Sequence, residues 1–332
     1  MVNIWIYPIR TVMRSDHTPA HALLTRLKLR HLRLLLALSH RGTAAAVATQ
    51  FHISPAAVSK ALTEIEDIAG TPLFERNARG MRPTAAGAEL IAGAGVVLAQ
   101  LERLAESLQA VRDGTQGRLT LAFRTNSVQP FLAQAVATFQ ERYPRVTIHV
   151  VEGGIGDMIE QLTEGELDLL FAYEDPRLER RELDLAPVIA GQDIVVVASP
   201  THPLRRRKHL AAQDLLEQRW CIHADGSRMQ HHLQTGFRAL GLPAPSHGIH
   251  TSDVPMTLNL LQYAGYLAFY PQRIAQQLVA AGTAWILPVT LPCRVEPVVA
   301  AWNRLLAPRA PALAFREFAL QQAAMQGLCS PA

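Results

Sequence analysis

Residues 28–87 read KLRHLRLLLALSHRGTAAAVATQFHISPAAVSKALTEIEDIAGTPLFERNARGMRPTAAG and have the pattern of a helix-turn-helix followed by a basic hairpin. Leu29, Leu32 and Leu36 repeat with the 3.6-residue period of a helix, and Gly42 follows as a stop signal. The stretch therefore begins with an amphipathic helix that turns one face toward a core.

Two helix starts follow this first helix. Thr43 is a suitable N-cap for a short helix rich in alanine, whose small side chains let another helix approach closely. Ser54 and Pro55 form a stronger start signal, because proline at the first helical position lacks only an N–H that the first turn cannot use. This third helix is predicted to run to about Ala69.

The second and third helices are only a few residues apart, so the chain makes a tight corner between them. This corner leaves one face of the third helix free to enter a major groove, and Ser59 and Lys60 lie on that face. Beyond the helix, Leu73 and Phe74 are predicted to be buried anchors of a wing that turns near Gly80. Arginines of such a wing reach phosphates or a minor groove. They are Arg76, Arg79 and Arg82.

Positive charge is concentrated in the same segment. Nine Lys and Arg residues face four Asp and Glu residues between Arg26 and Thr84, whereas the whole chain carries a net charge of +4. The rest of the chain is therefore slightly acidic. A short basic run alone is usually a solvated surface, and we give this reading to residues 205–208, but beside a helix-turn-helix it favours DNA binding.

The segment resembles the N-terminal domain of LysR-type transcriptional regulators. The matching motifs are LRHLR from Leu29, the alanine-rich helix after Thr43, HISPAAVSK around Ser54, LFER from Leu73 and RPTAAG from Arg82. Many members carry Gln-Pro after the serine, where this chain has Pro55-Ala56, so a base contact commonly assigned to that glutamine is absent or relocated. The expected DNA contacts are Thr43, Ala44, Ser54, Pro55, Ala56, Ser59, Lys60, Arg76, Arg79 and Arg82.

Length and composition imply several folded parts. The chain has 332 residues and 49% hydrophobic residues, enough for a core in each of two or three domains. We expect an N-terminal extension at 1–26 without an assigned function, a winged helix-turn-helix domain at 27–84 with its helix-turn-helix at about 44–63, a linker helix at 85–113 and an effector-binding domain at 117–325.

Several function classes find no support in the sequence. No stretch comes near the ~20 apolar residues of a membrane span, and the apolar start is too short for one and lacks a cleavage site, so we expect no membrane partner and a cytoplasmic protein. Three scattered cysteines, Cys221, Cys293 and Cys329, argue against a disulfide framework or a zinc site. Buried thiols and single-cysteine redox sensing both remain open. We expect no metal and no cofactor, because histidine spacing and phosphate-binding glycine loops are lacking.

The predicted linker helix carries an apolar seam. Val97, Leu101, Leu104, Leu108 and Val111 alternate in steps of four and three, as the a and d positions of a coiled coil do. Leu90 extends the seam backward, although two glycines weaken the helix between them. A helix packed on its own domain would give the same pattern. The family resemblance favours dimerisation, with a dimer or a dimer of dimers as the assembly.

Beyond residue 117 short apolar runs alternate with amphipathic segments. We predict strands at 118–123, 146–151, 167–172 and 194–198 and helices at 128–142, 156–164, 230–240, 254–264 and 273–280. Alternation of this kind implies mostly parallel sheets in an α/β fold. It resembles the two-lobed, periplasmic-binding-protein-like effector domain of the same family. The resemblance implies a first lobe at 117–191 and 292–325, and a second lobe at 192–291.

A ligand in such a fold sits between the lobes, near strand ends and helix N-termini that favour anions. Residues 124–127 and 223–228 are two polar loops that could converge there, although ordinary N-capping explains the same residues. The expected effector contacts are Arg124, Thr125, Asn126, Ser127, Gly154, Gly226, Ser227, Arg228, Asp253 and Tyr270. If Arg124 and Arg228 both face the cleft, a carboxylate is the natural ligand.

The sequence thus predicts a regulator that binds promoter DNA, a small effector, its own copies and RNA polymerase. Two alternatives stay open. One is a ligand-independent architectural DNA binder, which would not need the roughly 215 residues after the hinge at 113–117. The other is an enzyme whose site is assembled from distant residues, since no GxSxG, HExxH or P-loop motif is present.

Overall fold

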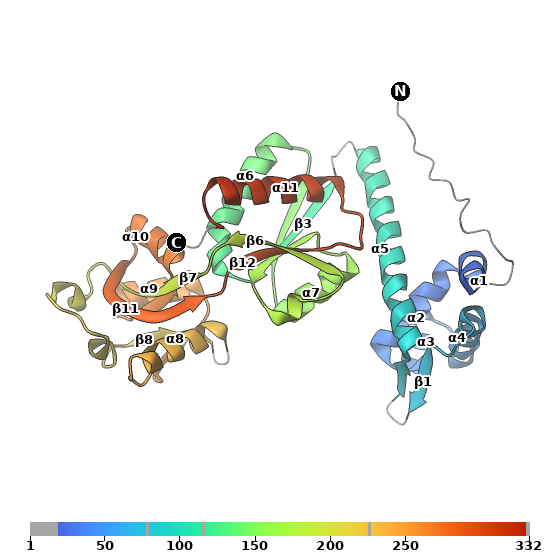
Figure 1. Cartoon of the computed structure of the whole chain (residues 1–332), viewed down its shortest axis with the longest axis horizontal. Helices are drawn as coiled ribbons and strands as arrows, with labels where there is room; N and C mark the ends of the chain where they lie inside the picture. The colour runs from blue at the N-terminus through green and yellow to red at the C-terminus, as the bar shows by residue number, and fades with distance from the viewer. Residues whose placement is uncertain (1–18, 78–79, 114–116, 225–226, 330–332) are drawn as a thin grey trace. The chain divides into compact units, whose positions relative to one another are not determined.

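The computed structural model describes residues 19–77, 80–113, 117–224 and 227–329. The chain divides into two compact units (Figure 1). The first contains the described residues up to Gln109 together with Leu305–Ala307, and the second contains Ala110–Arg304 and the chain from Pro308.

The first unit is a winged helix-turn-helix. Its elements are α1 (Pro19–Arg26), α2 (Leu29–Arg41), α3 (Ala44–Phe51), α4 (Pro55–Ala69), β1 (Phe74–Asn77), β2 (Gly80–Pro83) and α5 (Ala85–Asp113). The three helices and the hairpin predicted from the sequence are present. Helix α1 was not predicted, and it contacts α4, so the segment given no structure contributes to this unit.

Local signals in the sequence explain where these helices begin and end. The Thr43 hydroxyl accepts a hydrogen bond from the Ala46 N–H at 3.3 Å, and the Ser54 hydroxyl accepts one from the Ala57 N–H at 3.2 Å. Gly42 takes the left-handed conformation, with φ of 68°, that ends α2. The core beneath the helices contains Leu35, Leu38, Val58, Leu62, Ile65, Leu73 and Phe74.

The wing is held at both ends of its hairpin. At its start, the Glu66 carboxylate accepts hydrogen bonds from the N–H of Leu73 at 2.8 Å and of Phe74 at 3.3 Å. At the second strand, the Met81 N–H donates to the Gly42 carbonyl at 2.7 Å. The turn before α3 and the end of α4 therefore position the wing.

Helix α5 is a single helix of 29 residues that continues through Gly93 and Gly95. Leu90 and Ile91 pack against the helix-turn-helix core, so Leu90 does not belong to the seam, contrary to the sequence prediction. Four seam residues are exposed: Val97 by 46%, Leu101 by 38%, Leu104 by 56% and Leu108 by 61%. The side chain of Val111 lies outside the described ones.

The expectation that no stretch could span a membrane was wrong for this helix. By length and composition alone, Ala85–Ala105 is apolar enough to cross a bilayer, whereas the sequence analysis expected no such stretch. Leucine, valine, isoleucine and alanine supply this hydropathy. An apolar helix that pairs with another copy satisfies the same criterion.

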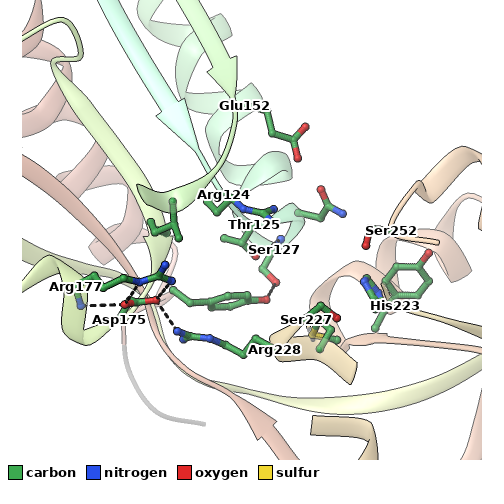
Figure 2. A pocket seen from close by; sticks show the side chains of 16 residues that line it. Arg124, Thr125, Ser127, Glu152, Asp175, Arg177, His223, Ser227, Arg228 and Ser252 are labelled. Carbon is green, nitrogen blue, oxygen red and sulfur yellow. Dashed lines mark hydrogen bonds and ion pairs between the residues drawn. The ribbon is translucent and has the colours of Figure 1, made fainter. Parts of the chain in front are cut away.

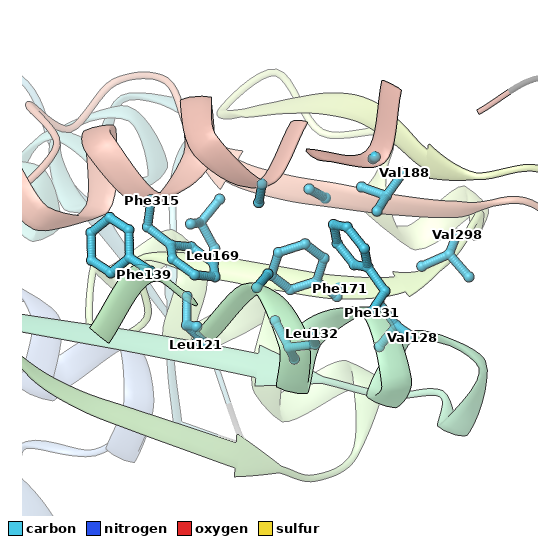
Figure 3. Close-up of a cluster of buried hydrophobic side chains, with 14 of the residues drawn as sticks. Leu121, Val128, Phe131, Leu132, Phe139, Leu169, Phe171, Val188, Val298 and Phe315 are labelled. Carbon is cyan, nitrogen blue, oxygen red and sulfur yellow. The ribbon is translucent and has the colours of Figure 1, made fainter. Parts of the chain in front are cut away.

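The second unit begins with a five-stranded sheet that we call the first lobe. Its order is β4 (Thr147–Glu152), β3 (Arg118–Phe123), β5 (Leu169–Tyr173), β12 (Val298–Asn303) and β6 (Leu183–Ile189). Helices α6 (Gln129–Arg142) and α11 (Ala310–Met325) cover one face, where Phe139 and Phe315 meet edge to face at 5.1 Å (Figure 3). Helix α7 (Ile155–Glu164) covers the other face.

The second lobe has a three-stranded sheet in the order β10 (Ala268–Pro271), β7 (Gln192–Ala198) and β11 (Trp285–Val295). Helix α8 (Arg228–Ala239) packs on one face, and α9 (Val254–Ala264) and α10 (Gln272–Ala280) pack on the other. Strands β8 (Trp220–Ile222) and β9 (Gly248–His250) form a separate parallel pair.

Two expectations about the lobes need correction. Among the described residues, only β3 with β4, β3 with β5, and β8 with β9 are parallel ladders. Strand β12 and the whole sheet of the second lobe are antiparallel. The predicted return to the first lobe at residue 292 is too early, because β11 stays paired with β7 until Val295 opposite Gln192. The chain crosses back at Glu296 and Pro297.

The three cysteines are not paired with one another. Cys221, Cys293 and Cys329 are all free thiols, and the first two are buried. Burial raises the pKa of Cys221 and of Cys293 to about 11, which disfavours the reactive thiolate. Within the described residues, no group of three His, Cys, Asp or Glu side chains is placed to hold a metal ion.

Candidate functional site

The first candidate surface lies at the N-terminal end of α4. Thr43 and Ser54 are exposed, and each uses a lone pair of its hydroxyl to cap a helix. Because a hydroxyl that accepts a hydrogen bond keeps its own proton, both side chains can still donate to a phosphate oxygen. The caps therefore orient two hydroxyl donors at adjacent helix starts.

The other predicted DNA contacts divide by exposure. Pro55, Ala56, Lys60 and Arg82 are exposed, Ser59 is half-buried, and Ala44 packs partly against the helix-turn-helix core. Ala44 is therefore a poorer contact than the sequence suggested. The side chain of Arg76 and the whole of Arg79 lie outside the described parts of the structure.

Thr63 was not predicted from the sequence as a DNA contact. It is exposed one helical turn beyond Ser59, and its hydroxyl donates to the Ser59 carbonyl at 3.1 Å. A spacing of four residues from Ser59 places both on one face of α4, and this signal was available in the sequence.

The second candidate site is a cavity of about 330 Å³ in the second unit, lined by both lobes (Figure 2). The two polar loops identified from the sequence meet there. The lining residues are Arg124, Thr125, Asn126, Ser127, Glu152, Ile155, Ala172, Tyr173, Asp175, Arg177, His223, Ser227, Arg228, Met229, Ser252 and Tyr270.

Three predicted effector contacts are not among these residues. Gly154 is the N-cap of α7, where its carbonyl accepts from the Met158 N–H. Asp253 is the N-cap of α9, and its carboxylate accepts from the Met256 N–H at 2.6 Å. Both are therefore explained by helix capping. Gly226 lies outside the described residues.

Arg228 joins the two lobes. From the start of α8 it donates to the Asp175 carboxylate at 2.8 Å and to the Glu174 carbonyl at 2.7 Å, both in the first lobe (Figure 2). It also lies 3.5 Å from the Glu296 carboxylate, at the return crossing. This charge is therefore balanced by protein groups, which corrects the idea that it serves primarily to hold a ligand.

Asp175 is the centre of this contact. Its side chain is 7% exposed and also accepts from Arg177, through Nε at 2.9 Å and Nη2 at 2.7 Å. Hydrogen bonds from Arg177 hold the pKa of Asp175 at about 2. The carboxylate therefore stays ionised and keeps both arginines in place.

Hydroxyl groups line the floor of the cavity. The Ser127 and Tyr173 hydroxyls are 2.5 Å apart, and burial raises the pKa of Tyr173. Burial also raises the pKa of Tyr270, to about 12. Both phenols therefore stay neutral and can exchange hydrogen bonds without adding charge.

His223 faces the cavity from the second lobe and packs edge to face against Phe269 at 5.3 Å and Tyr270 at 6.2 Å. Burial lowers its pKa to about 4. At neutral pH it is therefore an uncharged imidazole that offers one donor and one acceptor.

The sequence analysis missed the carboxylates and the aromatic residue on the first-lobe side. Glu152 and Tyr173 are the last residues of strands β4 and β5, and Asp175 and Arg177 come two and four residues after β5. Carboxyl ends of neighbouring parallel strands meet at one edge of a sheet, and this rule, applied to the predicted strands, would have pointed to these positions.

Family models match both units. The model described as "Bacterial regulatory helix-turn-helix protein, lysR family" matches residues 29–88, and the "LysR substrate binding domain" matches residues 112–324. The chain belongs to the LysR family. Together the two matches cover the helix-turn-helix, the wing and the two-lobed unit that holds the cavity.

Relatives and solved structures agree with this membership. The HTH-type transcriptional regulator GbpR of Azospirillum brasilense is 26% identical over 302 residues, which cover 90% of this chain and 88% of that protein. CbbR of Xanthobacter flavus is 27% identical over 275 residues, 82% of this chain and 80% of that protein. Full-length OxyR from Pseudomonas aeruginosa has the same fold, with a TM-score of 0.54, 19% identity and coverage of 92% and 96% of the two chains.

This LysR-family protein is therefore a DNA-binding transcriptional regulator with an effector-binding domain, and not an enzyme. Regulators of this family bind DNA, form oligomers and respond to small-molecule effectors.

Proposed function

We propose that this regulator binds promoter DNA as a dimer through α4 and the wing, and that a small molecule in the cavity between the lobes changes its affinity for the promoter. The observation that carries the proposal is the convergence of the loops at 124–127 and 227–228, one from each lobe, on one polar cavity. A ligand that contacts both lobes binds their alternative arrangements with different affinity, which is the condition for an effector.

The assignment of residues follows from exposure and charge. Thr43, Ser54, Ser59, Lys60 and Arg82 contact DNA, with Lys60 and Arg82 on phosphates. Pro55 and Ala56 offer no side-chain hydrogen bond where many relatives have glutamine, so base readout at that position differs. In the dimer, helix α5 supplies the contact between copies. The protein acts in the cytoplasm, where promoter DNA and RNA polymerase are present, and two dimers form a tetramer on extended promoters.

Asn126 gives a direct test of the cavity as the effector site. Its side chain lines the cavity, whereas Asn259, exposed on α9, does not. Promoter affinity would be measured by fluorescence anisotropy with and without metabolites of the genes beside this one. We expect Asn126→Ala to raise at least fivefold the metabolite concentration needed to change promoter affinity, because a hydrogen bond is worth about 1 kcal/mol. The matched variant Asn259→Ala retains the response.

An equal response in both variants would remove the cavity from the proposal. A promoter affinity that no metabolite changes would instead favour the architectural DNA binder.

A further inference from the structure

The cations that line the cavity are not equivalent. Arg177 and Arg228 both bind the Asp175 carboxylate, which is almost completely buried. Arg124 comes from the first-lobe loop after β3, is exposed to the cavity, and forms no hydrogen bond or ion pair through its guanidinium with any described residue. Among the described lining residues, Arg124 is thus the cation whose charge is left for a ligand.

The hydroxyl groups around it are oriented as donors. The Ser227 hydroxyl accepts from the Gln230 N–H at 3.2 Å, and the Ser252 hydroxyl accepts from the Ala224 N–H at 3.4 Å. Each keeps its own proton, which no described acceptor takes. In the Ser127 and Tyr173 pair, one hydroxyl donates to the other, so one further proton remains. These hydroxyl groups can therefore donate to an occupant of the cavity.

Glu152 limits the charge of that occupant. It lines the same cavity from the end of β4 and, among the described residues, forms no ion pair with Arg124 or with any other cation. A free carboxylate repels a second anionic group of the ligand, and it accepts hydrogen bonds from ligand hydroxyls. The volume of about 330 Å³ lies at the lower end of the ~300–1,000 Å³ range for small-molecule sites.

We infer that the effector is a small hydroxylated monocarboxylate, whose carboxylate binds Arg124 and whose hydroxyl groups bind Glu152 and the serine hydroxyls. This inference rests on the proposed function of the cavity. Arg228 is paired with Asp175 and does not select the charge of the ligand.

The test compares pairs of probes that differ only in the carboxylate. D-gluconate and D-glucitol share an open chain of hydroxyls, and 4-hydroxybenzoate and 4-hydroxybenzyl alcohol share an aromatic ring. Calorimetric titration of the full-length protein gives the ratio of the two dissociation constants in each pair. We expect the carboxylate to bind at least tenfold more tightly than its alcohol in one pair, because charged groups strengthen hydrogen bonds. The pair that responds identifies the carbon framework.

Two variants separate the roles of the arginines. Arg124→Gln should reduce the carboxylate preference to within about twofold, whereas Arg228→Gln should weaken the acid and the alcohol by similar factors and keep the ratio. A general loss of folding would weaken both ligands and leave the ratio unchanged, so the ratio reports on charge recognition. D-glucarate, with a second carboxylate, should bind at least tenfold more weakly than D-gluconate to the original protein, and Glu152→Gln should reduce that difference.

Preference for the alcohols, or a carboxylate preference that Arg228→Gln abolishes and Arg124→Gln leaves intact, would overturn the inference. If no probe binds while another class of metabolite changes promoter affinity in a manner that Asn126→Ala weakens, the inference fails and the proposed function stands. If no metabolite acts through the cavity, the proposed function fails with it.

Discussion

Gly87, in the first turn of α5, is a residue at which the DNA-binding unit leaves no room for a side chain. A Cβ atom there would lie 1.9 Å from the Leu73 carbonyl oxygen. That oxygen accepts a hydrogen bond from the Thr84 N–H at 2.9 Å, and the Gly87 N–H donates to the Thr84 hydroxyl at 3.0 Å. Helix α5 therefore starts against the base of the wing. Gly93, on the same helix, has nothing within 4 Å of its Cβ position.

Replacement of each of these two glycines by alanine should change the stability in opposite directions. Gly87→Ala should lower the free energy of unfolding by about 2–4 kcal/mol, because the backbone of Leu73 must move and its hydrogen bond is strained. Gly93→Ala should raise it by up to about 1 kcal/mol, because alanine favours a helix over glycine. Thermal unfolding of the full-length variants, followed by circular dichroism, measures both. Equal melting temperatures would contradict the close approach at Gly87.

His223 makes the stability of the second lobe dependent on pH. Its pKa is about 4 in the folded protein and 6.5 when exposed, so between these values the unfolded chain binds more protons. Stability rises with pH through this window and is lost as pH falls from 6.5 toward 4. The effect of Asp175 lies lower, because its pKa moves from 3.8 to about 2 and its contribution is lost below that range.

Replacing this histidine should reduce the sensitivity to acid. Between pH 7 and pH 5, His223 accounts for about 2 kcal/mol of lost stability in the unmodified protein. Chemical denaturation of His223→Gln should show a correspondingly smaller loss over the same interval. His209→Gln, which removes an exposed histidine, is the control. The same loss of stability in both variants would show that His223 is not held neutral by burial.

At the scale of elements, α5 has two apolar faces, one packed on its own unit and one exposed. Ala94 and Leu98 pack against Leu32 of α2, and this contact fixes the helix on its own unit. A neighbouring face exposes Val97, Leu101, Leu104 and Leu108 at a and d positions. Periodicity in the sequence indicated a single apolar seam and could not tell which apolar residues pack within one copy, which is why Leu90 was assigned to the seam. Only the tertiary contact decides which apolar residues are covered within one copy.

A charge within the exposed seam should prevent dimerisation. Leu104→Glu is expected to raise the dimer dissociation constant at least a hundredfold, because two carboxylates meet in an apolar interface. Ala92→Glu introduces the same residue at an exposed position outside the seam and should leave the dimer intact. Analytical ultracentrifugation gives the assembly state of each. A dimer that survives Leu104→Glu would assign dimerisation to another surface.

Strands were predicted less completely than helices. Strands β3, β4, β5 and β7 are rich in apolar residues, and the sequence predicted them within two residues of their observed limits. Strands β6, β11 and β12 were not predicted. They border the two chain crossings between the lobes. Val298 of β12 pairs with Ile189 of β6, and Val295 of β11 pairs with Gln192 of β7. Their partners are far away in the sequence, so neither a local turn nor a short-range pattern marks their ends.

For the whole molecule, charge separates the two functions. The basic excess lies in the helix-turn-helix segment, which must meet the phosphate backbone, and the two-lobed unit is close to neutral. Salt dependence is the signature of such contacts, because each phosphate that a cation neutralises releases counterions. Another exposed lysine, Lys208, belongs to the basic run of the second lobe and serves as a matched control.

Lys60→Ala should weaken promoter binding and reduce the slope of log affinity against log salt concentration by about 1. Lys208→Ala removes the same charge from the two-lobed unit and should change neither quantity. Fluorescence anisotropy at four salt concentrations gives both slopes. Identical slopes for Lys60→Ala and the unmodified protein would remove the phosphate contact of Lys60, and a reduced slope for Lys208→Ala would place DNA on the second lobe as well.

The sequence by itself determined the features that depend on neighbouring residues: the caps at Thr43 and Ser54, the helix stop at Gly42, the basic wing and the two polar loops. These signals are local, because a cap or a turn needs only the next few residues. The tertiary structure alone decided what Arg228 does, since its partner Asp175 is 53 residues away and in the other lobe. An ion pair of this kind depends on which residues meet in space. Because Arg228 is paired with Asp175 and Arg124 is not, Arg124 is the cation available to a ligand, although the two arginines looked alike in the sequence.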